Sequence, residues 1–154
     1  MHQVRPARLD DIPALISLMA EFYGESSYPL PEANARAAFA TLLADPRLGG
    51  AWIAWVDEEP VGHAVLTVGF SMEFGGMRGF IDDLFVRQSA RGRGVARALL
   101  DAVVTECNTR GVRALLVEVG PDNATARRVY ERAGLVDSGR LVLSRTLASP
   151  LHVE

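Results

Sequence analysis

The sequence predicts one α/β domain built on a mixed sheet that is covered by helices. Its 154 residues fit a single ordinary domain and leave no room for two substantial ones. The first half holds a short strand, two helix-like segments and three strand-like segments in an antiparallel meander. The second half alternates strand, helix, strand, helix and strand, which is typical of a partly parallel sheet.

The first elements follow from apolar spacing and from residues that end or cap a helix. Apolar residues between Ile12 and Tyr23 recur at three- and four-residue spacings, the pattern of an amphipathic helix. Asp45-Pro46 ends a second, alanine-rich helical pattern because the residue before proline disfavours helical geometry. These signals predict a strand at residues 2–5, a helix over 12–23, a turn at 24–31 and a helix over about 32–44.

Three strands follow, separated by turn-forming residues. Residues 51–56 and 61–70 are rich in Val, Ile, Trp and Phe, and the acidic turn before Pro60 joins them. A glycine-containing loop at residues 73–79 leads to a third strand over 80–86, which two adjacent acids interrupt.

The second half begins with a long helix over about 93–110, which Gly111 ends. The nearly continuous apolar run 114–119 predicts a strand buried on both faces. Another helix starts at residues 121–123 and ends at Gly134, and residues 141–143 provide a last strand.

The composition excludes several classes of function. Hydrophobic residues make up 49% and charged residues 23% of the chain, which excludes general disorder. A net charge of −3 disfavours electrostatic binding of nucleic acid. All 16 basic residues are arginine, so lysine nucleophiles and Schiff-base chemistry are excluded. Because no apolar run is long enough to span a membrane and the first residues do not form a signal peptide, we expect a cytoplasmic protein without membrane contact.

The sequence contains no convergent set of metal ligands, and we expect no metal. The single Cys107 forbids an internal disulfide and is interpreted as a small core residue. His63 lies within a predicted strand and is interpreted as a structural histidine, and His2 and His152 lie near the two ends.

The strongest local motif is Arg91-Gly92-Arg93-Gly94-Val95-Ala96, between the third meander strand and the long helix. Small residues let a backbone turn approach a ligand, and the helix start offers unpaired N–H donors, so the motif suits a pyrophosphate. The alternatives are a glycine-rich turn with two solvated arginines and a dinucleotide-binding module. The dinucleotide fingerprint is disfavoured because Arg97 stands where it needs a third small residue, and a P-loop would need a lysine.

Residues 80–135 resemble the GNAT superfamily of acetyl-CoA-dependent N-acetyltransferases. The family motif Q/R-x-x-G-x-G/A is matched by Arg91, Gly94 and Ala96, and Asp83-Leu84-Phe85-Val86 is similar to the strand before it. A second signature, an Asn followed seven residues later by Tyr and then by Gly-Phe, is matched by Asn123, Tyr130 and Gly134. The departures are Ala96 for the commoner Gly and Leu135 for Phe.

The resemblance implies a single domain over residues 1–154 with a mixed, mostly antiparallel sheet of six to seven strands and about four helices on both faces. It implies acetyl-CoA as co-substrate, with the pantetheine arm along the edge of the strand at Leu84, Phe85 and Val86 where it diverges from Leu116 to Val119. Asn123 would bind the pantetheine or serve only as a helix cap. The implied donor site comprises Leu84, Phe85, Val86, Arg91, Gly92, Arg93, Gly94, Val95, Ala96, Arg97, Asn123 and Tyr130.

The resemblance also implies catalytic roles. Tyr130 would protonate the leaving thiolate as a general acid, unless it is only an aromatic packing against the sheet. Asp82 matches the position where spermidine/spermine-type members carry a Glu, and it would act as a base through water or pair with a neighbouring arginine. Asp82 and Asp83 point to opposite faces of a regular strand, so we expect only one of them in the cleft unless a bulge intervenes.

The acceptor groove of such a fold is bounded by the first two helices and the loop after the third strand. An acidic and aromatic set in these segments suits a cation, so a small amine or polyamine-like acceptor is expected rather than an acidic one. Acetylation of a protein amine, a non-catalytic acyl-CoA-binding domain and a homodimer are further possibilities. The candidate acceptor residues are Tyr23, Glu25, Tyr28, Phe70, Glu73, Phe74 and Asp83.

Overall fold

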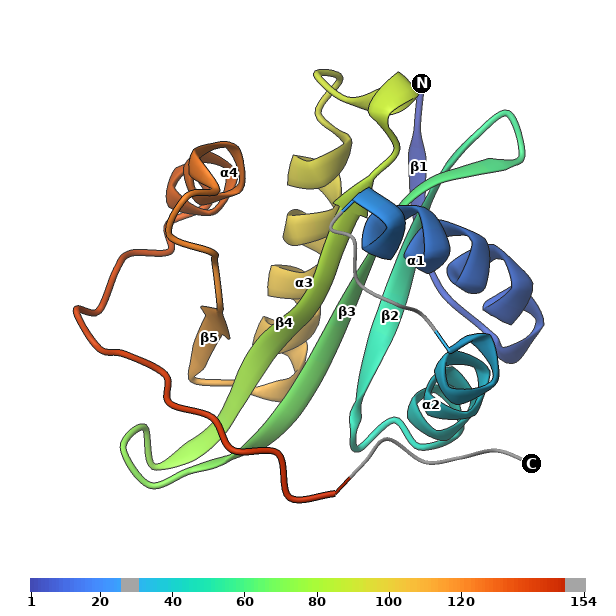
Figure 1. Cartoon of the computed structure of the whole chain (residues 1–154). Coiled ribbons are helices and arrows are strands. Elements are labelled where there is room, and N and C mark those ends of the chain that lie inside the picture. Colours follow the sequence, from blue (N-terminus) through green and yellow to red (C-terminus); the bar gives the residue numbers. More distant parts are fainter. Residues whose placement is uncertain (26–30, 149–154) are drawn as a thin grey trace.

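A computed structural model describes residues 1–25 and 31–148. A twisted sheet forms its centre, with α1 and α2 on one face and α3 and α4 on the other (Figure 1). The strands are β1 (Gln3–Pro6), β2 (Gly49–Val56), β3 (Glu59–Ser71), β4 (Gly76–Val86) and β5 (Ala114–Val117). The helices are α1 (Ile12–Glu25), α2 (Glu32–Ala44), α3 (Val95–Arg110) and α4 (Ala124–Arg132), with 3-10 turns at Leu9–Asp11 and Gln88–Ala90.

The strands lie in the order β1-β2-β3-β4-β5. The first four pair antiparallel, and β5 pairs parallel to β4. This mixed, mostly antiparallel sheet with helices on both faces confirms the predicted fold class. The predicted number of six to seven strands is wrong for the described residues, which form five, because residues 141–143 pair with no strand there.

Local chemistry accounts for the element boundaries. The backbone N–H of Arg8 donates to the Asp11 carboxylate at 2.8 Å, which fixes the entry to α1. Gly111 ends α3 in the left-handed region, with φ of 71°. The loop predicted at residues 73–79 is shorter than expected because Gly76 already pairs with Ser71 across the hairpin.

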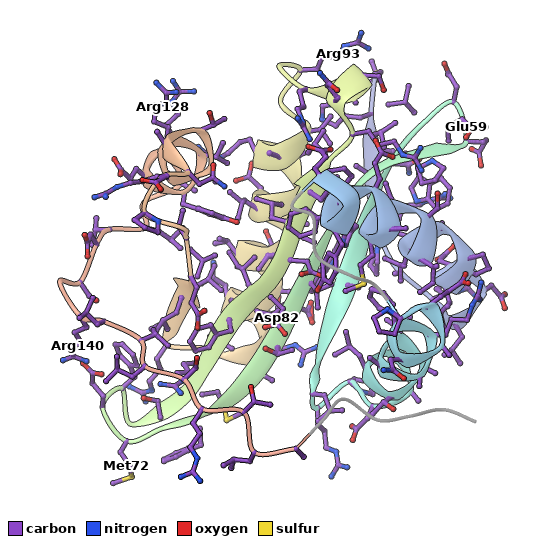
Figure 2. All side chains as sticks on the ribbon, in the orientation of Figure 1. Glu59, Met72, Asp82, Arg93, Arg128 and Arg140 are labelled. Atoms are coloured by element: carbon purple, nitrogen blue, oxygen red, sulfur yellow. The ribbon has the colours of Figure 1, made fainter. Side chains whose placement is uncertain are left out.

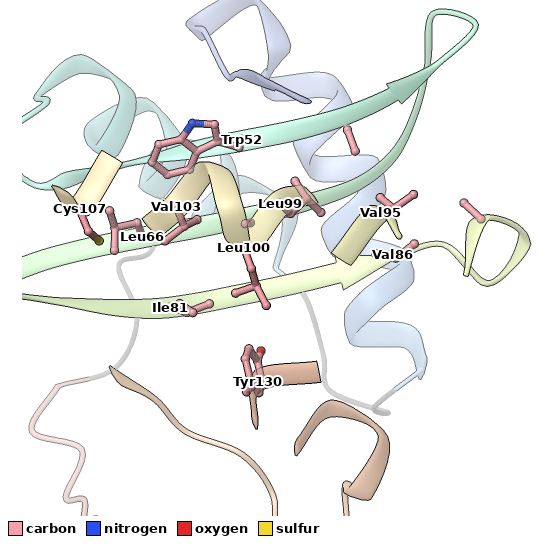
Figure 3. Close-up of a cluster of buried hydrophobic side chains, with 13 residues drawn as sticks. Trp52, Leu66, Ile81, Val86, Val95, Leu99, Leu100, Val103, Cys107 and Tyr130 are labelled. Carbon is pink, nitrogen blue, oxygen red and sulfur yellow. The ribbon is translucent and has the colours of Figure 1, made fainter. Parts of the chain in front are cut away.

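Two apolar clusters hold the helices to the sheet. One lies between the sheet and α1 and α2, and includes Leu15, Phe39 and Ile53. The other packs α3 against β2, β3 and β4, and Tyr130 of α4 lies at its border (Figure 3). Cys107 lies inside this second cluster, as predicted for a small core residue.

No helix within residues 1–25 and 31–148 is both long and apolar enough to cross a membrane.

Gly62 of β3 allows a close approach that any larger residue would prevent. A Cβ atom there would lie 2.7 Å from the Phe85 carbonyl oxygen and 3.3 Å from Leu99 Cδ1. We expect Gly62→Ala to lower the free energy of unfolding by about 1–3 kcal/mol, because backbone must move to relieve the contact. Urea denaturation measures the change.

Gly69→Ala is the matched control, because it lies in the same strand with nothing within 4 Å of the added Cβ. It should leave stability unchanged or raise it by roughly 0.5 kcal/mol, since alanine loses less chain entropy on folding than glycine does. Equal effects of the two substitutions would contradict the assignment of close packing to Gly62.

Candidate active site

An extra residue in β4 shapes the centre of the site. Val65 of β3 pairs with Asp83, but the next residue, Leu66, pairs with Ile81, so Asp82 is a β-bulge. A bulge interrupts the alternation of side chains along a strand. Asp82 and Asp83 therefore both line the same cavity, and the expectation that only one would do so holds only for a regular strand.

This cavity, of about 510 Å³, lies between the sheet and the first two helices. Figure 2 shows Asp82 on the face of the sheet that α1 and α2 cover. Among the described lining residues three are acidic and none is basic. The lining residues are Met19, Tyr23, Ala35, Ala38, Phe39, Leu42, Val65, Thr67, Phe80, Ile81, Asp82, Asp83 and Glu118.

Asp82 has a partner across the strands. The Thr67 hydroxyl donates to Asp82 Oδ1 at 2.8 Å. Burial raises the pKa of Asp82, the Thr67 hydrogen bond opposes that rise, and the charges of Asp83 and Glu118 add to it. A carboxyl group with a raised pKa is a better proton acceptor than an ordinary aspartate.

Asp83 is buried, with 9% of its surface exposed, and lies beside a buried histidine. His63 Nε2 is 3.7 Å from Asp83 Oδ2, and the imidazole packs against Phe22 and Phe85. Neither ring nitrogen of His63 has a hydrogen-bond partner among the described residues. His63 is therefore a core residue that faces a carboxylate of the cavity, and the expectation of a structural histidine with satisfied hydrogen bonds is not met among the described residues.

The pKa values of two nearby tyrosines are raised, and these carboxylates contribute to the rise. Burial, followed by the charge of Asp83, raises the pKa of Tyr130 to about 12. Burial raises the pKa of Tyr23 as well, with further contributions from Asp83 and then Asp82. Both phenols are therefore protonated at neutral pH, and Asp83 is the carboxylate that acts on both.

The pairing of β4 with β5 ends beside the bulge. Its last pair is Ile81 with Val117, whereas β4 continues to Val86. Among the described residues, the edge of β4 at Leu84 to Val86 is thus unpaired on the β5 side. The divergence begins only after Leu116 and Val117, which still pair with Phe80 and Ile81, and not along residues 116–119 as the sequence resemblance implied. The Val86 carbonyl accepts a hydrogen bond from Arg91 Nε at 2.9 Å.

The glycine-rich turn leaves the start of α3 uncapped. Gly92 and Gly94 have φ of 76° and 81°, a region that favours glycine. Gly94 is the N-cap, and no side chain of residues 1–25 or 31–148 bonds the first N–H groups of α3. A Cβ at either glycine would meet nothing within 4 Å, so open space lies in front of the turn.

The two arginines of this turn and Arg97, in the first turn of α3, have different surroundings. Arg91 Nη2 contacts both carboxylate oxygens of Glu25, at 2.7 and 2.9 Å. Arg97 bonds Asp101 and the Arg132 carbonyl, which ties α3 to α4. Arg93 extends outward from the turn (Figure 2). The backbone N–H of Arg91 donates to the Gln88 carbonyl, so it is already used, unlike those at the start of α3.

Asn123 is the N-cap of α4, and its Oδ1 accepts from the Ala126 N–H at 3.1 Å. The cap role considered from the sequence is therefore present. Its side-chain amide nitrogen is not used in this cap.

The acceptor residues predicted from the sequence are only partly brought together. Tyr23 and Asp83 line the cavity. Glu25 is paired with Arg91, and Glu73 with Arg140 at 2.7 Å. Phe70 is 64% exposed. Neither it nor Phe74 lines the cavity, and Tyr28 lies outside the described residues.

Sequence reasoning missed Thr67 and Glu118 as lining residues. Thr67 could not be found without the register of β3 against β4. Glu118 carried a signal, since it directly follows β5, and side chains at a strand end can meet a cleft. The prediction of a strand over 114–119 that is buried on both faces is wrong, because β5 ends at Val117 and its four residues are all partly exposed. No group of three His, Cys, Asp or Glu residues in the described part of the chain is arranged to hold a metal.

A model of the acetyltransferase (GNAT) family matches residues 12–135. L-methionine sulfoximine/L-methionine sulfone acetyltransferase of Pseudomonas aeruginosa is 25% identical over 90% of this chain and 82% of its own. IAA acetyltransferase of Azospirillum brasilense is 36% identical over 61 residues, and the match spans only 40% of either chain. Aminoglycoside N(6')-acetyltransferase type 1 of Salmonella typhimurium is 30% identical over 43% of this chain and 46% of its own.

Solved structures share the fold. An integron cassette protein from the mobile metagenome of Cole Harbour Salt Marsh is 49% identical, with a TM-score of 0.88 over 96% of this chain and 92% of that one. An aminoglycoside N-acetyltransferase in complex with CoA is 20% identical, with a TM-score of 0.84 over 96% of both chains, and shows similarity of fold alone.

The hydrogen bond from Thr67 predicts how the pKa of Asp82 will respond to mutation. Thr67→Val keeps the side-chain shape but removes the donor, so the ionised carboxylate loses a stabilising partner and the pKa of Asp82 rises. Thr67→Ser, the control, keeps a hydroxyl and should restore the lower pKa. Carboxyl ¹³C NMR titration, with Asp82→Asn to assign the signal, measures both. The same pKa in all three proteins would show that the bond does not act on Asp82.

Proposed function

The chain belongs to the GNAT family of N-acetyltransferases, and we propose that it transfers the acetyl group of acetyl-CoA to a primary amine of a small cationic acceptor. The observation that carries this proposal is the position of the acidic cavity. Asp82 and Asp83 lie at the point where β4 separates from β5, so a cationic amine in the cavity would meet a donor bound along β4.

The donor site combines a strand edge with a helix start. The unpaired edge of β4 at Leu84 to Val86 can pair with the amides of a pantetheine arm. The free N–H groups of Val95, Ala96 and Arg97 suit a pyrophosphate, because the helix dipole adds positive potential there. Arg93, on the open side of the turn, supplies a guanidinium for a further phosphate.

The acceptor proposal follows from charge. Asp82, Asp83 and Glu118 face a cavity that has apolar walls from α1 and α2, and none of the described lining residues is basic. Such a site favours an ammonium group and repels a carboxylate. A similar protein from Salmonella typhimurium is named for acetylating aminoglycosides, which are polycationic amines. For this chain we propose the broader class of small amines and polyamines.

The proposed chemistry is direct attack with both substrates bound. An ammonium acceptor loses a proton to Asp82, directly or through water, and the free amine then attacks the thioester carbonyl carbon. A C–N bond forms and the C–S bond breaks, and the leaving thiolate takes a proton from the Tyr130 hydroxyl. The acylated nitrogen gives up its second proton, which returns to the Tyr130 phenolate, so the products are the amide, the CoA thiol and a protonated Asp82 that releases its proton to solvent. Asp82 suits the base role because burial raises its pKa.

The charge of Asp83 connects binding of the acceptor to the acidity of Tyr130. With a pKa of about 12, its hydroxyl is protonated but is a weak acid, partly because of the charge of Asp83. An acceptor cation beside Asp83 would offset that charge and lower the pKa of Tyr130. The phenol would then donate more readily when an acceptor is bound than when it is absent.

Calorimetric titration with acetyl-CoA tests the donor site, with NAD as the control ligand. We expect micromolar binding of acetyl-CoA and none of NAD. Gly94→Ala should weaken binding about tenfold or more, because the new Cβ enters the open space before α3 and strains a left-handed residue. Gly111→Ala is the matched control, because it places the same backbone strain at the other end of the same helix. The affinity of this variant for acetyl-CoA should be unchanged.

Release of free CoA thiol in the presence of an amine panel tests the acceptor class. Diamines and aminoglycosides should be turned over faster than anionic amino acids. Folded protein that binds no acetyl-CoA would overturn the donor proposal. Binding without transfer to any amine would instead indicate an acyl-CoA-binding domain, and a preference for anionic acceptors would refute the acceptor class alone.

Tyr130→Phe tests the acid role. We expect kcat to fall by about a hundredfold, within the usual range for loss of a general acid, with acetyl-CoA affinity nearly unchanged. Steady-state kinetics and calorimetry on the same preparation separate the two effects. Lost affinity with normal turnover would make Tyr130 a binding or packing residue.

A further inference from the structure

The two walls of the acidic cavity differ in chemistry. Its three carboxylates come from the sheet side, with Asp82 and Asp83 in β4 and Glu118 directly after β5. The opposite wall belongs to α1 and α2, which cover this face of the sheet (Figure 1). Apart from the phenol of Tyr23, the described residues of that wall are apolar: Met19, Ala35, Ala38, Phe39 and Leu42. Apolar walls with a few charged groups on one side suit a ligand whose charge is confined to one end.

The carboxylates occupy the end of the cavity next to the proposed donor edge. On β4 the lining residues run from Phe80 to Asp83, so the two aspartates form the end that borders the unpaired edge. Glu118 follows the last residue of β5 that pairs with β4, and therefore continues beside the bulge. The charges of Asp83 and Glu118 both raise the pKa of Asp82, as expected of carboxylates that surround one place. A single ammonium at this end is attracted by all three.

The other end of the cavity is uncharged and lies beside a guanidinium. It is formed by Phe80 and Thr67, which pair across β4 and β3. The guanidinium carbon of Arg78 lies 5.3 Å from the centre of the Phe80 ring, although Arg78 itself does not line the cavity. A ligand with a second ammonium at this end would meet a like charge there. The two ends therefore favour one positive charge over several.

The cavity also has few partners for a ligand rich in hydroxyl groups. The hydroxyls of Thr67 and Tyr23 line it, and none of the described lining residues is an asparagine or a glutamine. The Thr67 hydroxyl already donates to Asp82 at 2.8 Å. A ligand with many hydroxyls would give up hydrogen bonds to water and would find few replacements at the apolar wall.

We propose that the acceptor is a primary amine with one positive charge and an apolar body, whose ammonium lies at Asp82 and Asp83 and whose body lies against α2 toward Phe80. The inference rests on the proposed acetyl transfer for the role of the site, and it narrows the acceptor class from small amines and polyamines to apolar monoamines. A volume of about 510 Å³ leaves room for such a body beside the ammonium.

The affinity for amines of graded length is the first measurement. Ethylamine, butylamine and hexylamine are titrated calorimetrically into the full chain in the presence of CoA. We expect the affinity to rise about threefold with each added methylene, because each one leaves water for the apolar wall. Hexamethylenediamine has the length of hexylamine and a second charge, and we expect it to bind about tenfold more weakly than hexylamine.

Ala38 of α2 provides a variant at the apolar wall. It lines the cavity and is exposed, so a new side chain there leaves the core intact. Ala38→Asp offers a partner to a second ammonium, and the ratio of the two six-carbon affinities should shift about tenfold toward the diamine. Ala40→Asp is the matched control, because Ala40 is exposed on the same helix and does not line the cavity. It adds the same charge and should keep the wild-type ratio.

Three results of these titrations would overturn the inference. One is equal affinity for ethylamine and hexylamine, and another is tighter binding of hexamethylenediamine than of hexylamine by the wild-type protein. The third is a ratio that Ala38→Asp leaves unchanged or that Ala40→Asp shifts equally, because the apolar wall would then not select the ligand.

Release of CoA thiol from acetyl-CoA separates this inference from the proposed function. We expect kcat/KM for the same amines to follow the order of their affinities. Preferred binding of hexylamine without thiol release from any amine would refute acetyl transfer and support the ligand class of the cavity. Transfer that favours hexamethylenediamine or an aminoglycoside over hexylamine would support acetyl transfer and overturn the inference.

Discussion

The site depends on one extra residue in β4. At Asp82 the pairing with β3 shifts by a residue, and pairing with β5 ends immediately before it, at Ile81. A bulge bends and twists its strand, so a bulge here accounts for both the divergence of the two strands and the common orientation of Asp82 and Asp83. The unpaired β4 edge and the acidic cavity therefore arise from the same irregularity.

The cavity brings three carboxylates together without a basic side chain among its described lining residues. Thr67 stabilises Asp82, and His63 lies beside Asp83, but no arginine from the described lining residues neutralises either one. Burial of the two phenols, and after it the charge of Asp83, raises the pKa values of Tyr23 and Tyr130, because a partly buried charge acts more strongly on neighbouring groups than one in water. A bound cation would relieve this unfavourable arrangement, so the electrostatics of the free site already favour the proposed substrate class.

The sequence predicted what local patterns control. The bounds of α2 and the order of the meander were predicted correctly, because helix spacing and turn residues act over a few neighbours. The bulge at Asp82 could not be predicted, since it depends on how β3 and β4 align. Likewise, nothing near Arg91 or Glu25 in sequence indicates that they pair across 66 residues. Residues 141–143 have the sequence pattern of a strand, but within the described residues they form none, because no other strand pairs with them.

The ion pairs that hold this protein together have a chemical consequence. Every permanent cation in the ion pairs of the described residues is a guanidinium, as in Arg91–Glu25 and Arg110–Glu106, and the 154 residues contain no lysine. A guanidinium stays protonated and is a poor nucleophile toward thioesters, whereas a lysine amine is a target for acetylation. No side chain offers an amine for self-acetylation. An enzyme that works in the presence of an acyl donor thereby keeps its surface charge, and the attractions that depend on it, unchanged by its own substrate.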